Sequence, residues 1–240
     1  MALVKKEFIS SNGHMLSYFI SDDTSAKKAH VFWFSAFTRG PLLGRLLKTE
    51  QKFHGFKVAS TTPDFSFTLI RDDSGLTGDG TYYFGKADNP FIEVAVAELI
   101  DHITSDIRAH SPETQFIGAG SSMGAYAATK FGILNNFDSV LTMVPHFDVE
   151  AAVKYCGRKK WVDWACEGAT QNNKSNIFRD FRFLPRHLEH TYPRSLLKVR
   201  WMTWEFTSNK LSPLWLCLES TAENFSLTTA PQVGIPWSMH

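Results

Sequence analysis

The sequence predicts an α/β protein built on a doubly wound, mainly parallel sheet. Apolar runs of strand length alternate with helical patterns from residue 29 onward, as in chains whose parallel strands are joined by helices. An antiparallel hairpin is indicated before them, and at residues 114–132 a strand pattern passes through small residues directly into a helical pattern. The 240 residues suffice for one large domain. We therefore expect a single domain at 1–240, with a lid insertion at 149–194, where the pattern is irregular.

The N-terminal elements follow from local patterns. Residues 4–10 and 15–21 are expected to be two strands joined at Asn12-Gly13, a dipeptide typical of tight hairpins. Residues 29–34 (AHVFWF) are nearly all apolar, as in a strand that helices bury on both faces. After this strand we expect a loop at 35–40, a helix at 41–53, a short strand at 57–61 and a long loop at 64–89.

The long loop is rich in aspartate, glycine and aromatic residues. Asp72, Asp73 and Asp79 raise the question of a cation site, but their spacing matches no EF-hand loop. We interpret them as a solvated turn.

The C-terminal elements are expected in the following order. Asn89-Pro90 is a helix start, and apolar residues on one face predict the helix that follows. Further elements are strands at 115–117, 140–144 and 199–206, a helix at 213–225, and an edge strand at 226–233 that contains Pro231.

The candidate nucleophile lies in the turn after residue 117. Gly120-Ser121-Ser122-Met123-Gly124 fits the pattern G-x-S-x-G with Ser122 at its centre. A serine on a sharp strand-to-helix turn has a strained backbone, and side chains at the two glycine positions would collide with neighbouring elements. The N–H of Met123, at the start of the helix, would be one oxyanion donor. The alternative is a small-residue turn that only lets a helix pack closely on a sheet.

The remaining catalytic groups are expected at the carboxyl ends of the other strands. The N–H of Phe37 is our choice for the second oxyanion donor, and Arg39 could hold an anionic substrate group. The chain order Ser, acid, His requires a histidine beyond the last strand as the base, and only His240 qualifies. His240 is also the final residue and could be frayed. His146 is the alternative base, with packing as its other role.

The orienting acid is expected after the strand at 199–206, where the sequence Thr207-Ser208-Asn209-Lys210 has no carboxylate. Asn209 could orient an imidazole by accepting a hydrogen bond. Glu205 and Asp148 are the alternatives. Glu205 could equally be a buried strand residue, and Asp148 a helix cap.

Four segments carry a resemblance to a known family: FSAFTRG, DGTYYFGK, GSSMGA and VPHFDVE. Over residues 30–240 the chain resembles α/β-hydrolase-fold enzymes of bacterial polysaccharide modification, notably the meningococcal-type capsule O-acetyltransferases. The resemblance implies acetyl transfer from acetyl-CoA to a sugar hydroxyl, with Ser122 transiently acetylated and His240 as base. Enzymes of that family carry an aspartate where this chain has Asn209, and their chains continue past the histidine.

Few residues are candidates for binding the acyl donor and the acceptor. The basic, aromatic-rich segment 178–200, which includes Arg182 and Arg186, could bind the phosphates of CoA or a polyanionic glycan; it could also be a solvated face. Tyr83, in the GTYY segment, is added as a candidate contact.

Composition narrows the function further. The net charge of +1 gives no overall attraction to nucleic acid, and no apolar run of about 18 residues could span a bilayer. Three cysteines without a C-x-x-C pair, and no signal-peptide pattern, predict a cytoplasmic protein. We also expect no metal site and no permanently bound cofactor. We expect a serine O-acetyltransferase that uses acetyl-CoA and a glycan or alcohol acceptor. The alternatives are a carboxylesterase or deacetylase and a catalytically silent binding protein.

Overall fold

The computed structural model describes residues 2–25, 27–37, 53–75, 78, 80–144, 159–169, 199–207, 210–221 and 224–229, the last three ranges as backbone. Most of the expected helix at 41–53 and most of the expected lid at 149–194 lie outside these residues. None of the described helices is long and apolar enough to cross a lipid bilayer.

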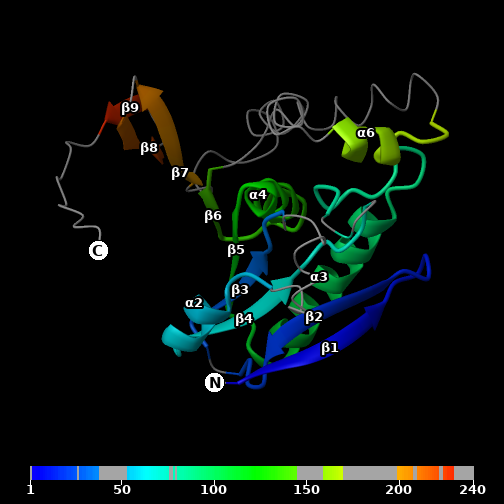
Figure 1. The fold of residues 1–240 in the computed structure, drawn as a ribbon. Coiled ribbons are helices and arrows are strands. Elements are labelled where there is room, and N and C mark those ends of the chain that lie inside the picture. The colour runs from blue at the N-terminus through cyan, green and yellow to red at the C-terminus, as the bar shows by residue number, and fades with distance from the viewer. Residues whose placement is uncertain are drawn as a thin grey trace, which may run out of the picture.

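One mixed sheet organises the chain, in the order β1-β2-β4-β3-β5-β6-β7-β8-β9 (Figure 1). Its central strands run parallel, from β4 through β3, β5 and β6 to β7, and antiparallel pairs extend it on both sides. This arrangement confirms the predicted mainly parallel sheet and places β1 and β9 at its two ends. The strands are β1 Leu3–Ile9, β2 Met15–Ser21, β3 Ala29–Phe34, β4 Phe65–Ile70, β5 Gln115–Ser121, β6 Ser139–Met143, β7 Val199–Thr207, β8 Lys210–Thr221 and β9 Asn224–Thr229.

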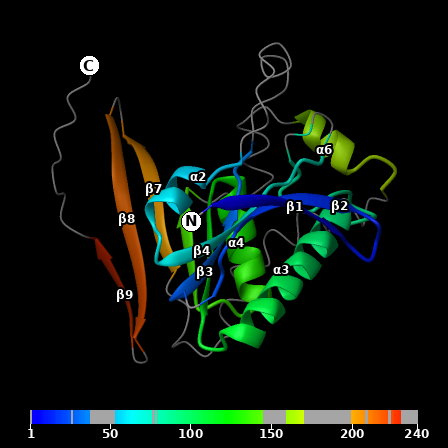
Figure 2. The ribbon, with the colours of Figure 1, turned by 90° about the horizontal axis from the view of Figure 1, so that it is seen from below.

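Helices cover both faces of the central strands. Side chains alternate between the two faces along each strand, so each strand contributes to a core on either side. In β3, Phe32 and Phe34 pack in the large core beneath α3 and α4, whereas Val31 and Trp33 pack in a smaller core with Ala59 of α2. Figure 2 shows α3 and α4 on one side of these strands and α2 on the other. The described helices are α2 Phe56–Thr61, α3 Phe91–His110, α4 Met123–Leu134 and α6 Lys159–Ala165.

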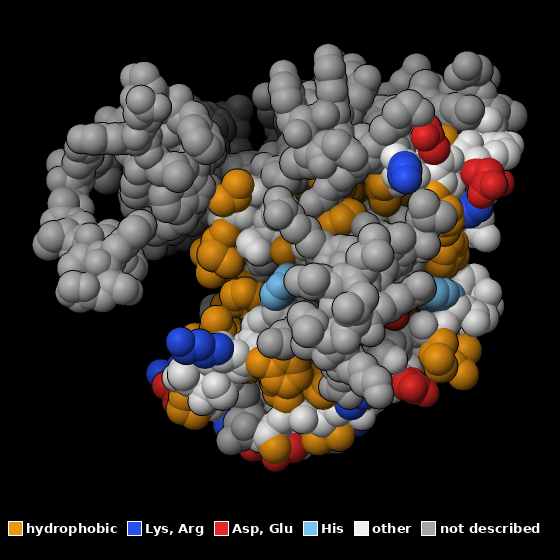
Figure 3. Space-filling view, in the orientation of Figure 1, with side chains coloured by type: hydrophobic (Ala, Val, Ile, Leu, Met, Phe, Trp, Pro, Cys, Tyr) orange, Lys and Arg blue, Asp and Glu red, His pale blue; other side chains and the backbone are white. Residues whose placement is uncertain are grey.

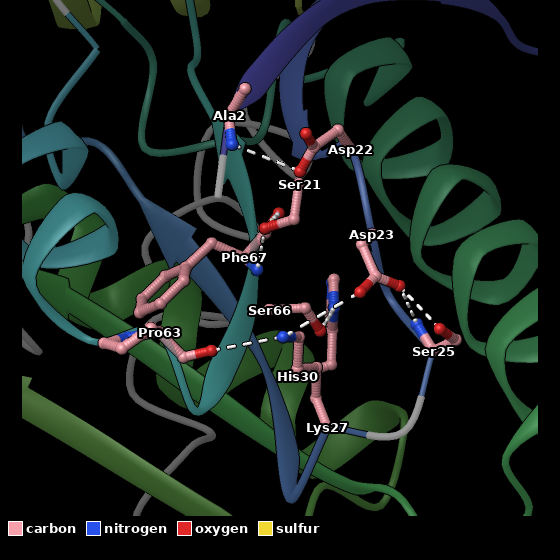
Figure 4. A network of polar contacts seen from close by, with 10 residues as sticks. All are labelled: Ala2, Ser21, Asp22, Asp23, Ser25, Lys27, His30, Pro63, Ser66 and Phe67. Atoms are coloured by element: carbon pink, nitrogen blue, oxygen red, sulfur yellow. Dashed lines mark hydrogen bonds and ion pairs between the residues drawn. The ribbon is translucent and has the colours of Figure 1, made fainter.

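β3 is buried along its whole length, as its apolar sequence predicts, although it contains a histidine. His30 is fully buried, and its two ring nitrogens lie 2.8 Å from the hydroxyl oxygens of Ser66 and Thr68 on β4. Figure 4 shows the imidazole directed at Ser66. Burial lowers the His30 pKa to about 3, so the ring is neutral at physiological pH.

Two predicted elements are wrong in the first half of the chain. The strand expected at 57–61 is helix α2, and the long loop expected from residue 64 begins with strand β4, which lies between β2 and β3. Only Ala59 of α2 is buried, whereas five of the six residues of β4 are buried. The prediction assigned the strand one element too early, since apolar residues in a short segment fit either structure and packing decides between them.

A third prediction is wrong near the C-terminus, where the helix expected at 213–225 is strand β8 and the start of β9. The leucines of this segment, Leu214, Leu216 and Leu218, recur every second residue, which is a strand period that the helical interpretation missed. β8 pairs with β7 from Arg200 to Thr207. The edge strand expected at 226–233 is β9, Asn224–Thr229.

Candidate active site

Ser122 lies alone between β5, which ends at Ser121, and α4, which begins at Met123. Its backbone has φ 53° and ψ −118°, a conformation that is costly for a residue with a side chain. The side chain is partly exposed. The chain therefore forms the strand, turn and helix that a G-x-S-x-G nucleophile requires.

The two glycines of the motif are needed because backbone lies against them. A Cβ on Gly120 would lie 2.3 Å from the carbonyl oxygen of Gly124, and a Cβ on Gly124 would lie 2.1 Å from the carbonyl oxygen of Phe34. Backbone atoms at these distances cannot rotate away as a flexible side chain can. The predicted collision thus has two partners, the start of α4 and the end of β3.

Backbone hydrogen bonds fix the turn between neighbouring elements. The Ser122 N–H donates to the Met143 carbonyl at 2.9 Å, and the Ser122 carbonyl accepts the N–H groups of Ala125 and Tyr126. The N–H of Met123 occupies the first helical position, where the helix itself offers no acceptor and the helix dipole is positive. An anion beside Ser122 would therefore meet this donor without any rearrangement of the turn.

The loop after β3 begins beside this turn, because Phe34 and Gly120 are partners in the β3–β5 register. The first two N–H groups of this loop already donate hydrogen bonds within the protein. The Ser35 N–H donates to the Ile70 carbonyl at 2.9 Å, and the Ala36 N–H donates to Nδ1 of His54 at 3.0 Å. Phe37 follows, with its side chain packed against the large core. This position keeps Phe37 as the candidate for the second oxyanion donor.

His54 bonds the same loop twice, since its own N–H donates to Oγ of Ser35 at 3.2 Å. Its imidazole is half-buried, and its pKa is lowered by desolvation and then by the positive charge of Arg71. The ring is therefore held in the neutral form that can accept at Nδ1. Sequence reasoning did not select His54, and no motif surrounds it.

Asp72 overturns the prediction of a solvated acidic turn, because its side chain is buried. One carboxylate oxygen accepts the N–H groups of Thr81 at 2.6 Å and Tyr83 at 2.7 Å, and the other accepts the N–H of Ser74 at 3.0 Å. These bonds hold the loop in shape, which includes positive φ angles at Tyr82 and Tyr83. Asp73 is exposed, as expected.

Tyr83, predicted as a contact for the donor or acceptor, is a buried residue of the loop after β4. Its side chain is fully buried, and its hydroxyl lies 3.0 Å from the Ser35 carbonyl and 3.1 Å from the Ile70 carbonyl. Burial, with the nearby Asp72 charge, raises the pKa of Tyr83 well above its usual value, so the hydroxyl stays protonated and can donate. Tyr83 therefore supports the loop after β3 from beneath.

The preceding residue connects this support to the nucleophile. The Tyr82 N–H donates to Sδ of Met123 at 3.3 Å, and its ring lies edge-on to Tyr126 of α4 and Trp161 of α6. The loop after β4 thus contacts both halves of the predicted oxyanion site: Ser35 on one side and Met123 on the other.

The other predicted site residues are not brought together by the described part of the chain. Glu205 lies on β7, two strands from β5, and its backbone alone is described. The predicted residues outside the described ranges are His240, Asn209, Asp148, His146, Arg39, Arg182 and Arg186. The roles of all eight stay predictions.

Charges and metal ligands are spread out in the described structure. On the face seen in Figure 3, the described Lys and Arg side chains lie at separate points rather than in one stripe. Within the described ranges, no three His, Cys, Asp or Glu side chains are grouped to hold a metal ion.

Comparison with known proteins gives structural relatives alone, because no family model and no curated protein matches this sequence. The Glycosylation Associate Protein (Gap123) complex of Streptococcus agalactiae matches with a TM-score of 0.58 at 17% identity, over 82% of this chain and 35% of that chain. The capsule O-acetyltransferase of Neisseria meningitidis serogroup A matches with a TM-score of 0.55 at 16% identity, over 80% of this chain and 77% of that chain. A mutant of that enzyme in complex with CoA gives a TM-score of 0.58 over 82% of this chain.

The chain shares the fold of these structures. The mainly parallel α/β fold predicted from the sequence is thereby confirmed. At 16–17% identity the likeness concerns the fold, and the chain spans only about a third of the streptococcal chain (35%).

Proposed function

We propose that this chain is an acyl-transfer enzyme with Ser122 as nucleophile, and specifically an O-acetyltransferase that moves acetyl from acetyl-CoA to a glycan hydroxyl. The observation that carries the proposal is the backbone of Ser122, a strained conformation between β5 and α4 that two glycines make possible. A turn that served packing alone would need no strained serine at its tip. The likeness to a capsule O-acetyltransferase, one structure of which holds CoA, supports the choice of donor.

In the proposed reaction, Oγ of Ser122 attacks the thioester carbonyl while the base takes the hydroxyl proton. The tetrahedral oxyanion is stabilised by the N–H groups of Met123 and Phe37. The CoA thiolate then leaves with the proton, and acetyl-Ser122 remains. A sugar hydroxyl, deprotonated by the same base, attacks this ester and restores Ser122.

The proposed base is His240 oriented by Asn209, with His146, Glu205 and Asp148 as the alternatives. Arg39, Arg182 and Arg186 are the proposed contacts for the phosphates of CoA or the charges of the glycan. We place the protein in the cytoplasm, where acetyl-CoA is available and where three cysteines would remain reduced.

The test is intact-mass spectrometry of the protein after incubation with acetyl-CoA and, separately, with p-nitrophenyl acetate. Ser122→Ala is compared with wild type and with Ser121→Ala, a matched control on the neighbouring serine. We expect acetyl-CoA to add one acetyl group to wild type and to Ser121→Ala, and none to Ser122→Ala.

Other outcomes redirect the proposal. An adduct or turnover from the ester alone would favour an esterase that uses water as acceptor. No Ser122-dependent adduct or turnover with either donor would refute the enzyme and favour a binding protein. An adduct equal in all three proteins would refute Ser122 as the nucleophile.

A further inference from the structure

The loop that is proposed to supply the second oxyanion donor is tied to a histidine 18 residues away along the chain. Two hydrogen bonds join the two segments in opposite directions: Ala36 N–H to Nδ1 of His54, and His54 N–H to Oγ of Ser35. The second bond uses the backbone of His54 and would persist with any non-proline residue there. The first bond uses the imidazole and depends on its protonation state.

A backbone N–H can only donate a hydrogen bond, so Nδ1 of His54 must carry a lone pair. The neutral ring therefore has its proton on Nε2. When the ring gains a second proton, Nδ1 becomes a donor that faces another donor at 3.0 Å. The bond to Ala36 is then replaced by repulsion, and its N–H loses its partner in a half-buried setting.

The other polar groups of the loop show which peptide the protonation of His54 would affect. The Ser35 N–H donates to the Ile70 carbonyl, and the Ser35 carbonyl accepts the Tyr83 hydroxyl. Neither the Ile70 carbonyl nor the Tyr83 hydroxyl titrates near neutral pH. The Ala36 N–H is held by His54 alone among the bonds described, and Phe37 is the next residue. Protonation of His54 thus acts at the peptide immediately before the proposed donor.

We infer that neutral His54 positions the loop at residues 35–37 for acyl transfer by Ser122, and that protonation of His54 releases this loop. The inference rests on the proposed function, because it assigns His54 a role in that same site. His54 does not touch the reacting atoms and is a positioning residue. It makes the activity sensitive to acid through a group other than the catalytic base.

The charged groups around His54 favour its neutral state. Arg71, which follows β4, is the described charge that acts on the ring, and it lowers the His54 pKa in addition to desolvation. Arg71 in turn lies in the field of Asp73, Tyr83 and Asp72.

Two substitutions separate the acceptor from the titration. In His54→Asn, the side-chain oxygen can take the place of Nδ1 and accept the Ala36 N–H, but it cannot be protonated. In His54→Leu, the acceptor is lost at every pH. The readouts are kcat and KM for p-nitrophenyl acetate from pH 5 to 8, and the ¹⁵N–¹H shift of the Ala36 amide over the same range.

We expect His54→Asn to keep near-wild-type kcat at pH 8, and His54→Leu to lose about 10- to 100-fold in kcat with little change in KM, as for a displaced oxyanion donor. In wild type, log(kcat/KM) should fall with a slope approaching 2 in acid, because both the base and His54 take up protons. The slope should be 1 in His54→Asn. The Ala36 amide should titrate in wild type and not in His54→Asn.

The possible failures are distinguishable. If wild type shows no Ser122-dependent turnover, the proposed function is refuted and the catalytic role of His54 falls with it. If Ser122 is active but the acid slope is the same in wild type and His54→Asn, or the Ala36 amide does not titrate, only the inference on His54 is overturned.

Discussion

Acidification from pH 8 to pH 5 is expected to lower the free energy of unfolding by about 2 kcal/mol through His30 alone. His30 is fully buried between the hydroxyls of Ser66 and Thr68, and burial lowers its pKa to about 3. In the unfolded chain a histidine titrates near 6.5. Between these values the unfolded state binds a proton that the folded state does not, so stability falls as the pH falls.

The magnitude follows from the size of that gap. At pH 5 the medium is about 1.5 units below the unfolded pKa, and each unit corresponds to about 1.4 kcal/mol, which gives about 2 kcal/mol. The full loss, about 5 kcal/mol, would be reached only below pH 3.

The assay is urea unfolding followed by tryptophan fluorescence at pH 8, 6.5 and 5. His30→Gln keeps an amide donor and acceptor for the two hydroxyls but does not titrate, so its unfolding free energy should depend less on pH than that of wild type, by about 2 kcal/mol over the range. Its absolute stability will be lower, and only the change with pH is compared. His102→Gln, at an exposed position, is the control and should follow wild type. An equal pH dependence in His30→Gln and wild type would refute the reasoning.

Two further predictions concern the turn at Ser122 and the loop beside it. Gly124→Ala should lower the free energy of unfolding by about 3 kcal/mol, because its Cβ meets the Phe34 carbonyl. Gly132→Ala, in the same helix, meets a side-chain methyl of the buried Val140 rather than backbone, so it should cost less, about 1–2 kcal/mol. Equal costs in urea unfolding would contradict the close-approach argument. Asp72→Asn should lower the free energy of unfolding by about 2 kcal/mol, because an amide N–H₂ cannot accept the backbone N–H groups that Asp72 now holds; an unchanged urea midpoint would contradict this.

The parts of the fold that the sequence predicted well are those set by short-range patterns. The hairpin at Asn12-Gly13 needs only its own turn residues, and β3 is apolar enough to be buried in any context. The turn at Ser122 is encoded within five residues, although the carbonyl that excludes a side chain at Gly124 belongs to Phe34 on β3.

The errors arose where packing chose between two local possibilities. α2 carries β-branched residues that suit a strand, but only Ala59 is buried, and β4 takes the place in the sheet. The burial of Asp72 was hard to predict because three of its partners are backbone N–H groups, which are present in every sequence and are not indicated by any residue type. An Asx-type turn at Asp72-Asp73-Ser74 was the available signal.

His54 illustrates what a single sequence cannot predict. Its contact with Ala36 spans 18 residues, depends on where β3 and α2 are placed, and follows no spacing rule. Residues whose role is to hold a backbone segment in place therefore emerge from coordinates, whereas the nucleophile emerges from its motif.

The position of β1 at the end of the sheet bears on how the protein behaves at high concentration. An outermost strand presents a row of backbone N–H and carbonyl groups, which a strand from a second molecule can pair with to begin ordered aggregation. Three consecutive charged residues, Lys5, Lys6 and Glu7, are exposed on β1. A second molecule that paired its own strand with β1 would have to remove water from these charges and bring like charges together. The residues of the fold that are least involved in its core thus act as its protection against self-association.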